Sequence, residues 1–378
     1  MDYEILKLIW WVLVGVLLIG FAITDGYDLG TANLLPFMSK TDSERRIMVN
    51  AIAPHWDGNQ VWLITAGGAM FAAWPLVYAT AFSGFYWAMI LVLFALLIRP
   101  MALDYRSKID DPRWRAACDW GLFASGVVPS LVFGVAFGNL FQGYGFDLDN
   151  LMRSSFTGTF FGLLNPFALL CGVVSLAMLN MQGAAWQALR AGSPIQERAA
   201  KTARLFAVVT IVTFALAGVW VANIPGFEIT SVIDPNAASN PLAKTVAMVE
   251  SGRWLANYSK YPWMLIAPVL GFAGALGVVL LAKTRFHALT FISSSITQAG
   301  VIMTAGFSLF PFILPSSSHP EVSLTVWDAT SSYMTLAIMT FVAAVFVPIV
   351  LGYTIWCFYK MWGRVTAEHV SENSHSLY

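Results

Sequence analysis

Nine apolar segments, each long enough to cross the hydrocarbon core of a membrane, constrain the fold of this chain more than any other feature. A helix that crosses this core needs about 20 mainly apolar residues. The apolar runs are continuous and not alternating, so helices are favoured over a β-barrel. The fold class that follows is an all-α polytopic membrane protein with about nine transmembrane helices. The expected spans cover roughly residues 8–23, 54–74, 78–98, 120–140, 160–179, 205–222, 263–282, 288–309 and 333–357.

The composition agrees with this class. Hydrophobic types make up 58% of the 378 residues and charged types 11%, whereas a soluble domain carries about 25% charged residues. The 21 basic and 21 acidic side chains cancel, so nucleic acid is not an expected partner. The 3 cysteines are widely spaced and form neither a disulfide framework nor a metal-binding pattern. An ordinary soluble domain and a disordered chain are therefore excluded.

One uncharged stretch, residues 58–98, is too long for a single span. Pro75 and Gly84 lie near its middle, and both residues interrupt helices. We expect two spans here, at residues 54–74 and 78–98, joined by a tight turn.

The basic residues predict the orientation in the membrane. Nine spans place the two termini on opposite faces, and 16 of the 21 basic residues then fall on one face. Because short cytoplasmic loops are enriched in Lys and Arg, the N-terminus is expected outside and the C-terminus in the cytoplasm. The cytoplasmic set is Lys40, Arg45, Arg46, Arg99, Arg106, Lys108, Arg113, Arg115, Arg190, Arg198, Lys201, Arg204, Lys283, Arg285, Lys360 and Arg364. The outer set is Lys7, Arg153, Lys244, Arg253 and Lys260.

The spans divide into two four-helix bundles plus one additional helix. Residues 1–150 hold the first expected four-helix repeat, residues 155–315 the second, and residues 333–360 the ninth helix, all in a single membrane domain. The Asn-Leu-Leu-Pro-Phe sequence at 33–37 is echoed by Leu-Leu-Asn-Pro-Phe at 163–167, which favours an internal repeat.

Two local patterns predict further structure. The longest outer loop, residues 223–262, is rich in turn-forming residues, so we expect turns and a short surface helix. Gly134 and Gly138 form a GxxxG pattern, which favours close packing between two helices.

Ionisable residues gather at the expected cytoplasmic ends of the first four spans. A carboxylate at the membrane edge is costly unless it is paired or solvated. Pro54 suits the first position of a helix, which places Asp57 in the first turn, where the helix dipole favours its negative form. The six candidates are Asp25, Asp28, His55, Asp57, Arg99 and Asp119.

Two interpretations of this group remain open. In the first, the carboxylates cap helices and pair with Arg99, and so only stabilise the bundle. In the second, the group is the mouth of a proton or ion path from the cytoplasm. His55 beside Asp57 suits proton handling, since an unperturbed histidine titrates near pH ~6.5.

The histidines do not point to a haem in this chain. Haem iron is usually held by His or Met, and no histidine falls in the middle of an expected span. The 15 methionines match ordinary membrane packing, and no phosphate-binding loop or catalytic triad is visible. The histidines are His55, His287, His319, His369 and His375.

Four blocks of sequence form a distinctive set. They are Asp-Gly-Tyr-Asp-Leu-Gly at 25–30, Ala-Pro-His-Trp-Asp-Gly-Asn-Gln-Val-Trp at 53–62, residues 94–108 with Arg99-Pro100, and Thr-Val-Trp-Asp-Ala-Thr-Ser-Ser at 325–332. With these blocks the chain resembles subunit II of the cytochrome bd-type ubiquinol oxidases, and the bd-II form in particular. The resemblance covers the whole chain, and its most specific part is the Pro-His-Trp-Asp-Gly-Asn block.

The resemblance implies a complex in the bacterial inner membrane, with the N-terminus of this chain periplasmic. Subunit I carries haem b and haem d, oxidises quinol in the membrane and reduces oxygen to water. Subunit II holds no haem and no covalently bound cofactor. A small single-helix subunit often accompanies the pair, and a ubiquinone can sit within subunit II as a structural cofactor.

The resemblance also assigns two residues. The carboxylate that matches Asp57 lies at the entrance of a cytoplasmic proton path at the subunit interface, so the chain helps to generate proton motive force. Trp62 matches a position near a lateral opening for oxygen. Two alternatives are kept: a secondary transporter or ion channel of repeat architecture, and a subunit needed only for assembly.

Overall fold

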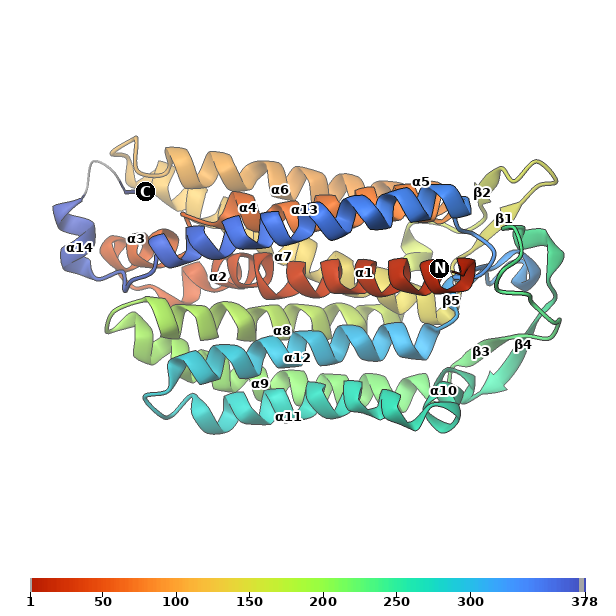
Figure 1. Cartoon of the computed structure of the whole chain (residues 1–378). Coiled ribbons are helices and arrows are strands. Elements are labelled where there is room, and N and C mark those ends of the chain that lie inside the picture. Colours follow the sequence, from red (N-terminus) through yellow and green to blue (C-terminus); the bar gives the residue numbers. More distant parts are fainter. Residues whose placement is uncertain (1, 374–376) are drawn as a thin grey trace.

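The molecule is a bundle of long helices that run along one common direction (Figure 1). The structure is a computed structural model and describes residues 2–373 and 377–378, so His375 lies outside the described residues. We call one end of the bundle the basic end, because the helix ends and loops that carry the 16 basic residues of the expected cytoplasmic set meet there. We call the opposite end the sheet end, because all six strands lie there. The split of basic residues between the two ends is therefore confirmed.

Eight helical segments in the described part of the chain are long and apolar enough to cross a membrane, which confirms the all-α polytopic class. The first contains α1 (Tyr3–Ile23) and α2 (Asp25–Met38), and the sixth contains η4 (Pro262–Leu265) and α11 (Ile266–Leu281). The others are α6 (Tyr86–Tyr105), α7 (Pro112–Gln142), α8 (Pro166–Arg190), α9 (Ile195–Val221), α12 (His287–Leu309) and α13 (Tyr333–Lys360).

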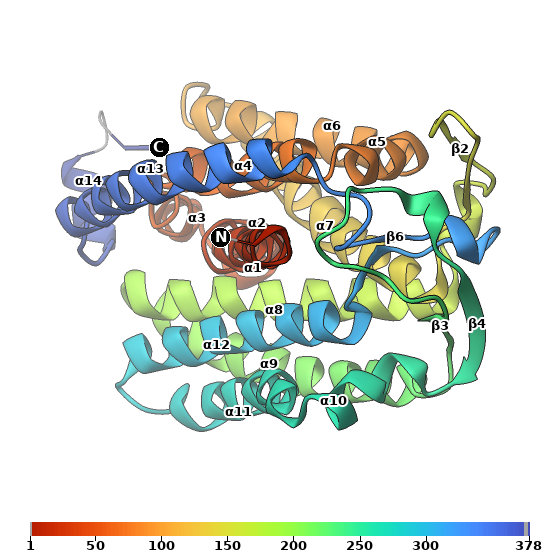
Figure 2. The ribbon, with the colours of Figure 1, turned by 45° about the vertical axis from the view of Figure 1, so that its right-hand side comes forward.

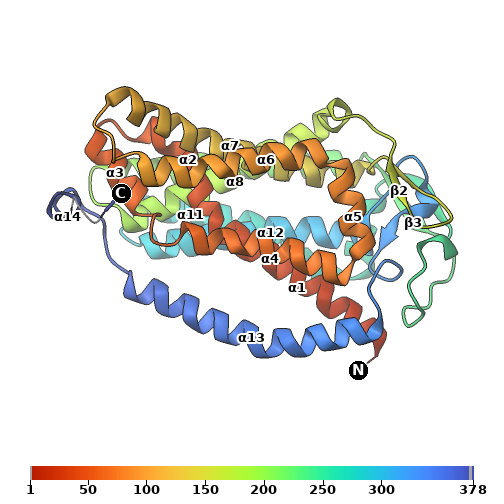
Figure 3. The same cartoon turned by 90° about the horizontal axis from the view of Figure 1, so that it is seen from above.

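The remaining expected span, residues 54–74, forms helix α4 (Trp56–Ala73), which packs against α1. It is not among the eight, because Asp57, Asn59 and Gln60 make its first turns polar. The expected tight turn after it is wrong. Pro75 starts a separate helix, α5 (Pro75–Gly84), which turns across the sheet end before α6 begins (Figure 3).

The first span is also more complex than expected, because the chain stays helical after residue 23. Thr24 separates α1 from α2, and its hydroxyl donates to the Gly20 carbonyl at 2.7 Å. Such a bond from a threonine to the preceding turn often bends a helix. Asp25 and Asp28 consequently lie in the first turn of α2, inside the bundle and not in a loop.

Two groups of helices pack on each other through α8. Helices α8, α9, α11 and α12 contact one another and form the second group, while α2 and α7 both pack on α8 from the first group. Figure 2 shows α1 and α2 between a layer that contains α4 and α6 and a layer that contains α8 and α12. The proposed internal repeat is not tested by these contacts and stays a prediction.

Glycines set the closest helix contacts. A Cβ added to Gly30 of α2 would collide with the Leu179 carbonyl of α8, and one added to Gly183 of α8 would collide with Gly30. The GxxxG prediction is confirmed, because Gly134 and Gly138 of α7 lie directly against the α8 backbone. Small residues at these crossings let the helix backbones approach closely.

Short hairpins close the sheet end. The strands pair as β1 (Phe146–Leu148) with β2 (Ser154–Phe156), β3 (Pro225–Ile229) with β4 (Val246–Ser251), and β5 (Phe312–Leu314) with β6 (Leu324–Thr325). The short helix expected in the longest loop is α10 (Ala256–Lys260), whereas its hairpin was not expected. Further short helices are α3 (Asp42–Asn50), α14 (Ala367–Glu372), η1 (Phe161–Leu163), η2 (Pro241–Ala243), η3 (Arg253–Leu255) and η5 (Pro320–Val322).

Candidate functional site

A buried ion pair joins α2 to α6. Arg99 Nη1 donates to Asp25 Oδ1 at 2.5 Å, and the second contact, from Nη2 to Oδ2, measures 3.5 Å. The two side chains are 1% and 0% exposed. Breaking such a pair leaves a buried charge without its partner, which is strongly destabilising. The predicted pairing of Asp25 with Arg99 is therefore present in the structure.

Asp28 is buried beside this pair but has a different environment. Its Oδ2 accepts a hydrogen bond from Asn59 Nδ2 of α4 at 2.8 Å, and the same nitrogen donates to the Tyr27 hydroxyl at 2.6 Å. Asp28 Oδ1 is buried and has no hydrogen-bond partner among the described residues. We call Asp25, Asp28, Asn59 and Arg99 the buried carboxylate cluster. It contains two carboxylates and one guanidinium group.

Asp57 lies at the surface of the basic end, in the first turn of α4, as predicted. Asn59 follows it on the same helix and is 3% exposed. One helix therefore presents a solvent-facing carboxylate at its start and, within the next turn, a side chain bonded to Asp28. This arrangement links the surface of the basic end to the buried carboxylate cluster.

His55 precedes α4 and is buried, unlike the neighbouring Asp57. Its ring stacks on Phe358 of α13 with a centroid distance of 4.0 Å, and its Nε2 atom has no partner in the described part of the chain. The histidine thus contacts the last long helix and not the buried carboxylate cluster.

Asp119 belongs to a second, separate set of charges. It accepts from Arg106 Nε at 2.6 Å and pairs with Arg45 at 3.3 Å, while Arg106 also pairs with Asp42 at 2.7 Å. These contacts join α7 to the start of α3 and to the residue that follows α6. Within the ranges that the structure describes, these hydrogen bonds and ion pairs of Asp119 do not reach the buried carboxylate cluster. The predicted pairing with Arg99 is therefore not seen for Asp119, and its role in a proton path stays a prediction.

Trp62 lies further along α4 and is partly buried. Its ring packs directly against Gly20 of α1, and a Cβ at Gly20 would collide with it. This contact explains why an aromatic residue fits here. A role in an oxygen route is not tested by it and stays a prediction.

Sequence reasoning missed Tyr378, which lies next to Asp57. Its backbone N–H donates to Asn50 Oδ1 at 2.9 Å. Burial, and after it the Asp104 carboxylate, raise the pKa of Tyr378. Asp104 belongs to the sequence block at residues 94–108 that carries the family resemblance. Its proximity to Tyr378, at the other end of the chain, could not be predicted from spacing in the sequence.

The described residues offer no obvious metal centre. None of them form a group of three or more His, Cys, Asp or Glu side chains that could hold a metal ion. The four described histidines lie before α4, at the start of α12, in a loop at the sheet end and in α14.

Comparisons with known proteins agree on one family. Residues 6–361 match the family model described as "Cytochrome bd terminal oxidase subunit II". The chain is 56% identical over 378 residues to "Cytochrome bd-I ubiquinol oxidase subunit 2" of Escherichia coli strain K12, with 100% of both chains covered. It is 31% identical to "Cytochrome bd ubiquinol oxidase subunit 2" of Bacillus subtilis strain 168, covering 95% of this chain and 96% of that one.

A solved structure supports the fold. One chain of the bd oxidase from Geobacillus thermodenitrificans superposes with a TM-score of 0.62 at 14% identity, covering 96% of this chain and 99% of that chain. The transporter or channel alternative is not favoured by any of these matches. The bd-II assignment is not tested by them and stays a prediction.

Proposed function

The chain belongs to the cytochrome bd terminal oxidase subunit II family, and from that premise we propose that it carries protons from the basic end into a quinol oxidase. Membership makes it a subunit of a membrane-bound oxidoreductase complex, which implies a partner subunit I. The proton-carrying role is our addition and rests on the arrangement of this chain's own carboxylates.

The observation that supports this role is the bare Oδ1 atom of Asp28. A buried carboxylate without a full set of partners is costly, whereas its protonated form is neutral and tolerates burial. Arg99 compensates the charge of Asp25 through two contacts, which leaves Asp28 as the excess negative charge of the cluster. Binding one proton at Asp28 Oδ1 would remove that charge.

We propose the following sequence of proton positions. Asp57 takes up a proton at the surface of the basic end, with the Tyr378–Asp104 pair beside it. The proton then reaches Asp28, which Asn59 holds toward α4. The Asp25–Arg99 pair stays ionised throughout, so the net charge of the cluster changes only at Asp28 as that residue gains and loses the proton. From there the proton passes toward the partner subunit.

The rest of the complex is proposed by family resemblance. Haem b and haem d belong to subunit I and supply the electron transfer and oxygen reduction there, with ubiquinol as the donor. A small single-helix subunit and a structural ubiquinone within this chain stay predictions without an assigned site. We place the chain in the bacterial inner membrane with its basic end in the cytoplasm, so that protons consumed in water formation come from inside and proton motive force is generated.

The experiment that tests this proposal is Asp57→Asn in the whole complex. We expect the complex to assemble with an unchanged haem spectrum, while oxygen consumption and membrane-potential generation in proteoliposomes each fall several-fold. The matched control is Glu368→Gln, which neutralises an exposed carboxylate of α14 at the same end. Unchanged turnover in an intact Asp57→Asn complex would leave the chain with an assembly role only.

A further inference from the structure

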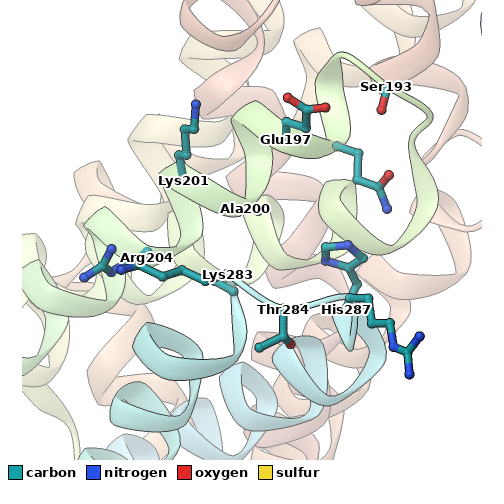
Figure 4. Close-up of a pocket in the computed structure, with 11 residues that line it drawn as sticks. Ser193, Glu197, Ala200, Lys201, Arg204, Lys283, Thr284 and His287 are labelled. Carbon is teal, nitrogen blue, oxygen red and sulfur yellow. The ribbon is translucent and has the colours of Figure 1, made fainter.

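A cavity at the basic end, outside the buried carboxylate cluster, combines a positive lining with an apolar border. It has a volume of about 550 Å³ and lies between the start of α9 and the loop that joins α11 to α12 (Figure 4). Pockets of this size hold small ligands in many proteins. Helices α9 and α11 lie on the opposite side of the molecule from α6 and α13 (Figure 1), so the cavity faces away from the buried carboxylate cluster's ion pair with α6.

The cavity lining carries an excess of positive charge. Lys201 and Arg204 come from α9, Lys283 and Arg285 come from the loop, and Glu197 is the one acidic lining residue. In Figure 4 the Lys283 side chain extends from the loop toward Arg204. Among the described residues none of these five side chains takes part in an ion pair, and all five are exposed. The cations are therefore free to bind an anion.

Two helix starts add to this charge. Helix α9 begins at Ile195 and helix α12 at His287, and the cavity touches the first turn of each. Neither start has a side-chain cap hydrogen bond. The backbone N–H groups and the positive end of the helix dipole favour an anion at such a position, phosphate in particular.

The residues that border the cavity are apolar, which favours a lipid over a soluble anion as the ligand. Leu205 of α9, Leu280 of α11 and Leu289 of α12 each follow or precede a lining residue of the cavity by one or two positions, and they are 60%, 63% and 47% exposed. These exposed leucines form an apolar border beside the positive lining. A ligand with a phosphate in the cavity and acyl chains along these helices would satisfy both surfaces. Basic pockets between transmembrane helices are known to suit anionic lipid headgroups.

We propose that this cavity binds the headgroup of an anionic phospholipid from the membrane leaflet at the basic end. Lys201, Arg204 and Lys283 contact the phosphate, and the exposed leucines contact the acyl chains. The proposal does not depend on the proton path, because no residue of the cavity belongs to the buried carboxylate cluster or to its link with Asp57.

The test is native mass spectrometry of the detergent-purified complex, titrated with phosphatidylglycerol and, separately, with phosphatidylcholine. The variant is Lys201→Gln with Lys283→Gln, and the matched control is Lys40→Gln with Lys360→Gln, two exposed lysines elsewhere at the same end. We expect phosphatidylglycerol to bind the variant about 25-fold more weakly than the control complex, since each of the two removed cations contributes about a factor of five. Arginine at both variant positions should restore binding.

Three results would overturn the proposal. Equal phosphatidylglycerol affinity in the variant and the control would show that the cavity does not hold the lipid. Equal binding of phosphatidylcholine to the unmodified complex would show that the negative charge is not recognised. Complete displacement of the lipid by millimolar inorganic phosphate would identify a site for a soluble anion instead. An unchanged haem spectrum in the variant verifies that it is folded.

Discussion

Asp25 and Asp28 share the first turn of α2, yet their surroundings differ. Asp25 is bonded to Arg99 through both of its oxygens, whereas Asp28 keeps one buried oxygen bare. The first arrangement is that of a structural ion pair, and the second is that of a group which can exchange a proton. We therefore expect the first interpretation to hold for Asp25 and Asp119 and the second to hold for Asp28.

This difference predicts opposite effects of two isosteric substitutions. Asp25→Asn removes the carboxylate that directly contacts buried Arg99, which should cost about 3–5 kcal/mol and reduce the yield of assembled complex. Asp28→Asn keeps the shape and the bond with Asn59, so assembly should be retained while turnover falls. Haem absorbance per amount of complex measures assembly, and oxygen consumption per haem measures turnover. Normal turnover in the Asp28→Asn complex would contradict the proton-carrying role of Asp28.

A second prediction concerns acid stability at the contact of α3 with α9. Hydrogen bonds from Arg198 lower the pKa of Glu44 to about 2, below its value of about 4.3 in an unfolded chain. Because the pKa is depressed on folding, the stabilisation is complete above pH ~4.3 and is lost as the pH falls toward 2.

Apparent Tm values of the unmodified complex and of Glu44→Gln should therefore differ at pH 7 and converge as the pH falls below about 4. Glu368→Gln, which removes an exposed carboxylate, should leave Tm unchanged at every pH. A difference between Glu44→Gln and the unmodified complex that widens on acidification would mean that the Glu44–Arg198 contact does not stabilise the fold.

Individual residues of the site were predictable only where the sequence puts them at a helix end. Asp57 lies in the first turn of a helix, as predicted, but the expected place of Pro54 at the first helical position is wrong, because α4 begins at Trp56. The hydrogen bond between Asn59 and Asp28 joins two helices whose relative orientation cannot be predicted from the sequence. Tyr378 lies near Asp57 only because the folded chain brings its last residue back to the start of α4. Rotations of helices about their axes depend on packing, and a strongly apolar sequence has no polar face to fix them.

At the scale of elements, the α2–α8 crossing depends on two glycines. Gly30 and Gly183 lie so close to the opposite backbone that a methyl group has no room. Gly30→Ala should force the helices apart at a cost of about 1–3 kcal/mol. The matched control is Gly218→Ala in α9, where nothing lies within 4 Å of an added Cβ. The thermal stability of the complex should fall for Gly30→Ala alone, and equal stability of the two variants would argue against this tight crossing.

The elements show why helix positions were predictable and helix breaks were not. Apolar runs of about 20 residues predict spans because the bilayer imposes their length. The break at Thr24 and the extra helix α5 arise from local hydrogen bonds and from contacts such as that of Gly84 with Tyr144. The length of an apolar run does not predict such contacts. The hairpin of β3 and β4 was missed for the same reason, since its loop sequence shows turn residues without alternation.

At the scale of the whole molecule, α13 stands apart from the bundle. Among the described residues of this helix only Leu336 is buried, and the helix lies along one side of the molecule in Figure 3. An apolar helix so little covered by its own chain must meet lipid or another subunit, which agrees with a chain that belongs to an oxidase complex.

The orientation in the membrane gives the last prediction. Since 16 of the 21 basic residues lie at one end, that end should face the cytoplasm. In a background with Cys118, Cys171 and Cys357 replaced by serine, Val232→Cys places a thiol at a fully exposed position of the sheet end, and Ala367→Cys places one in α14 at the basic end.

A membrane-impermeant maleimide should label Val232→Cys in spheroplasts and Ala367→Cys only after the membrane is opened. The result decides more than topology. Asp57 lies at the basic end, so the expected labelling means that protons enter from the side on which water formation must consume them for charge to be separated. The reverse labelling would place Asp57 outside, where proton uptake would cancel the release from quinol, and the proton-carrying role proposed for this chain would fail with the orientation.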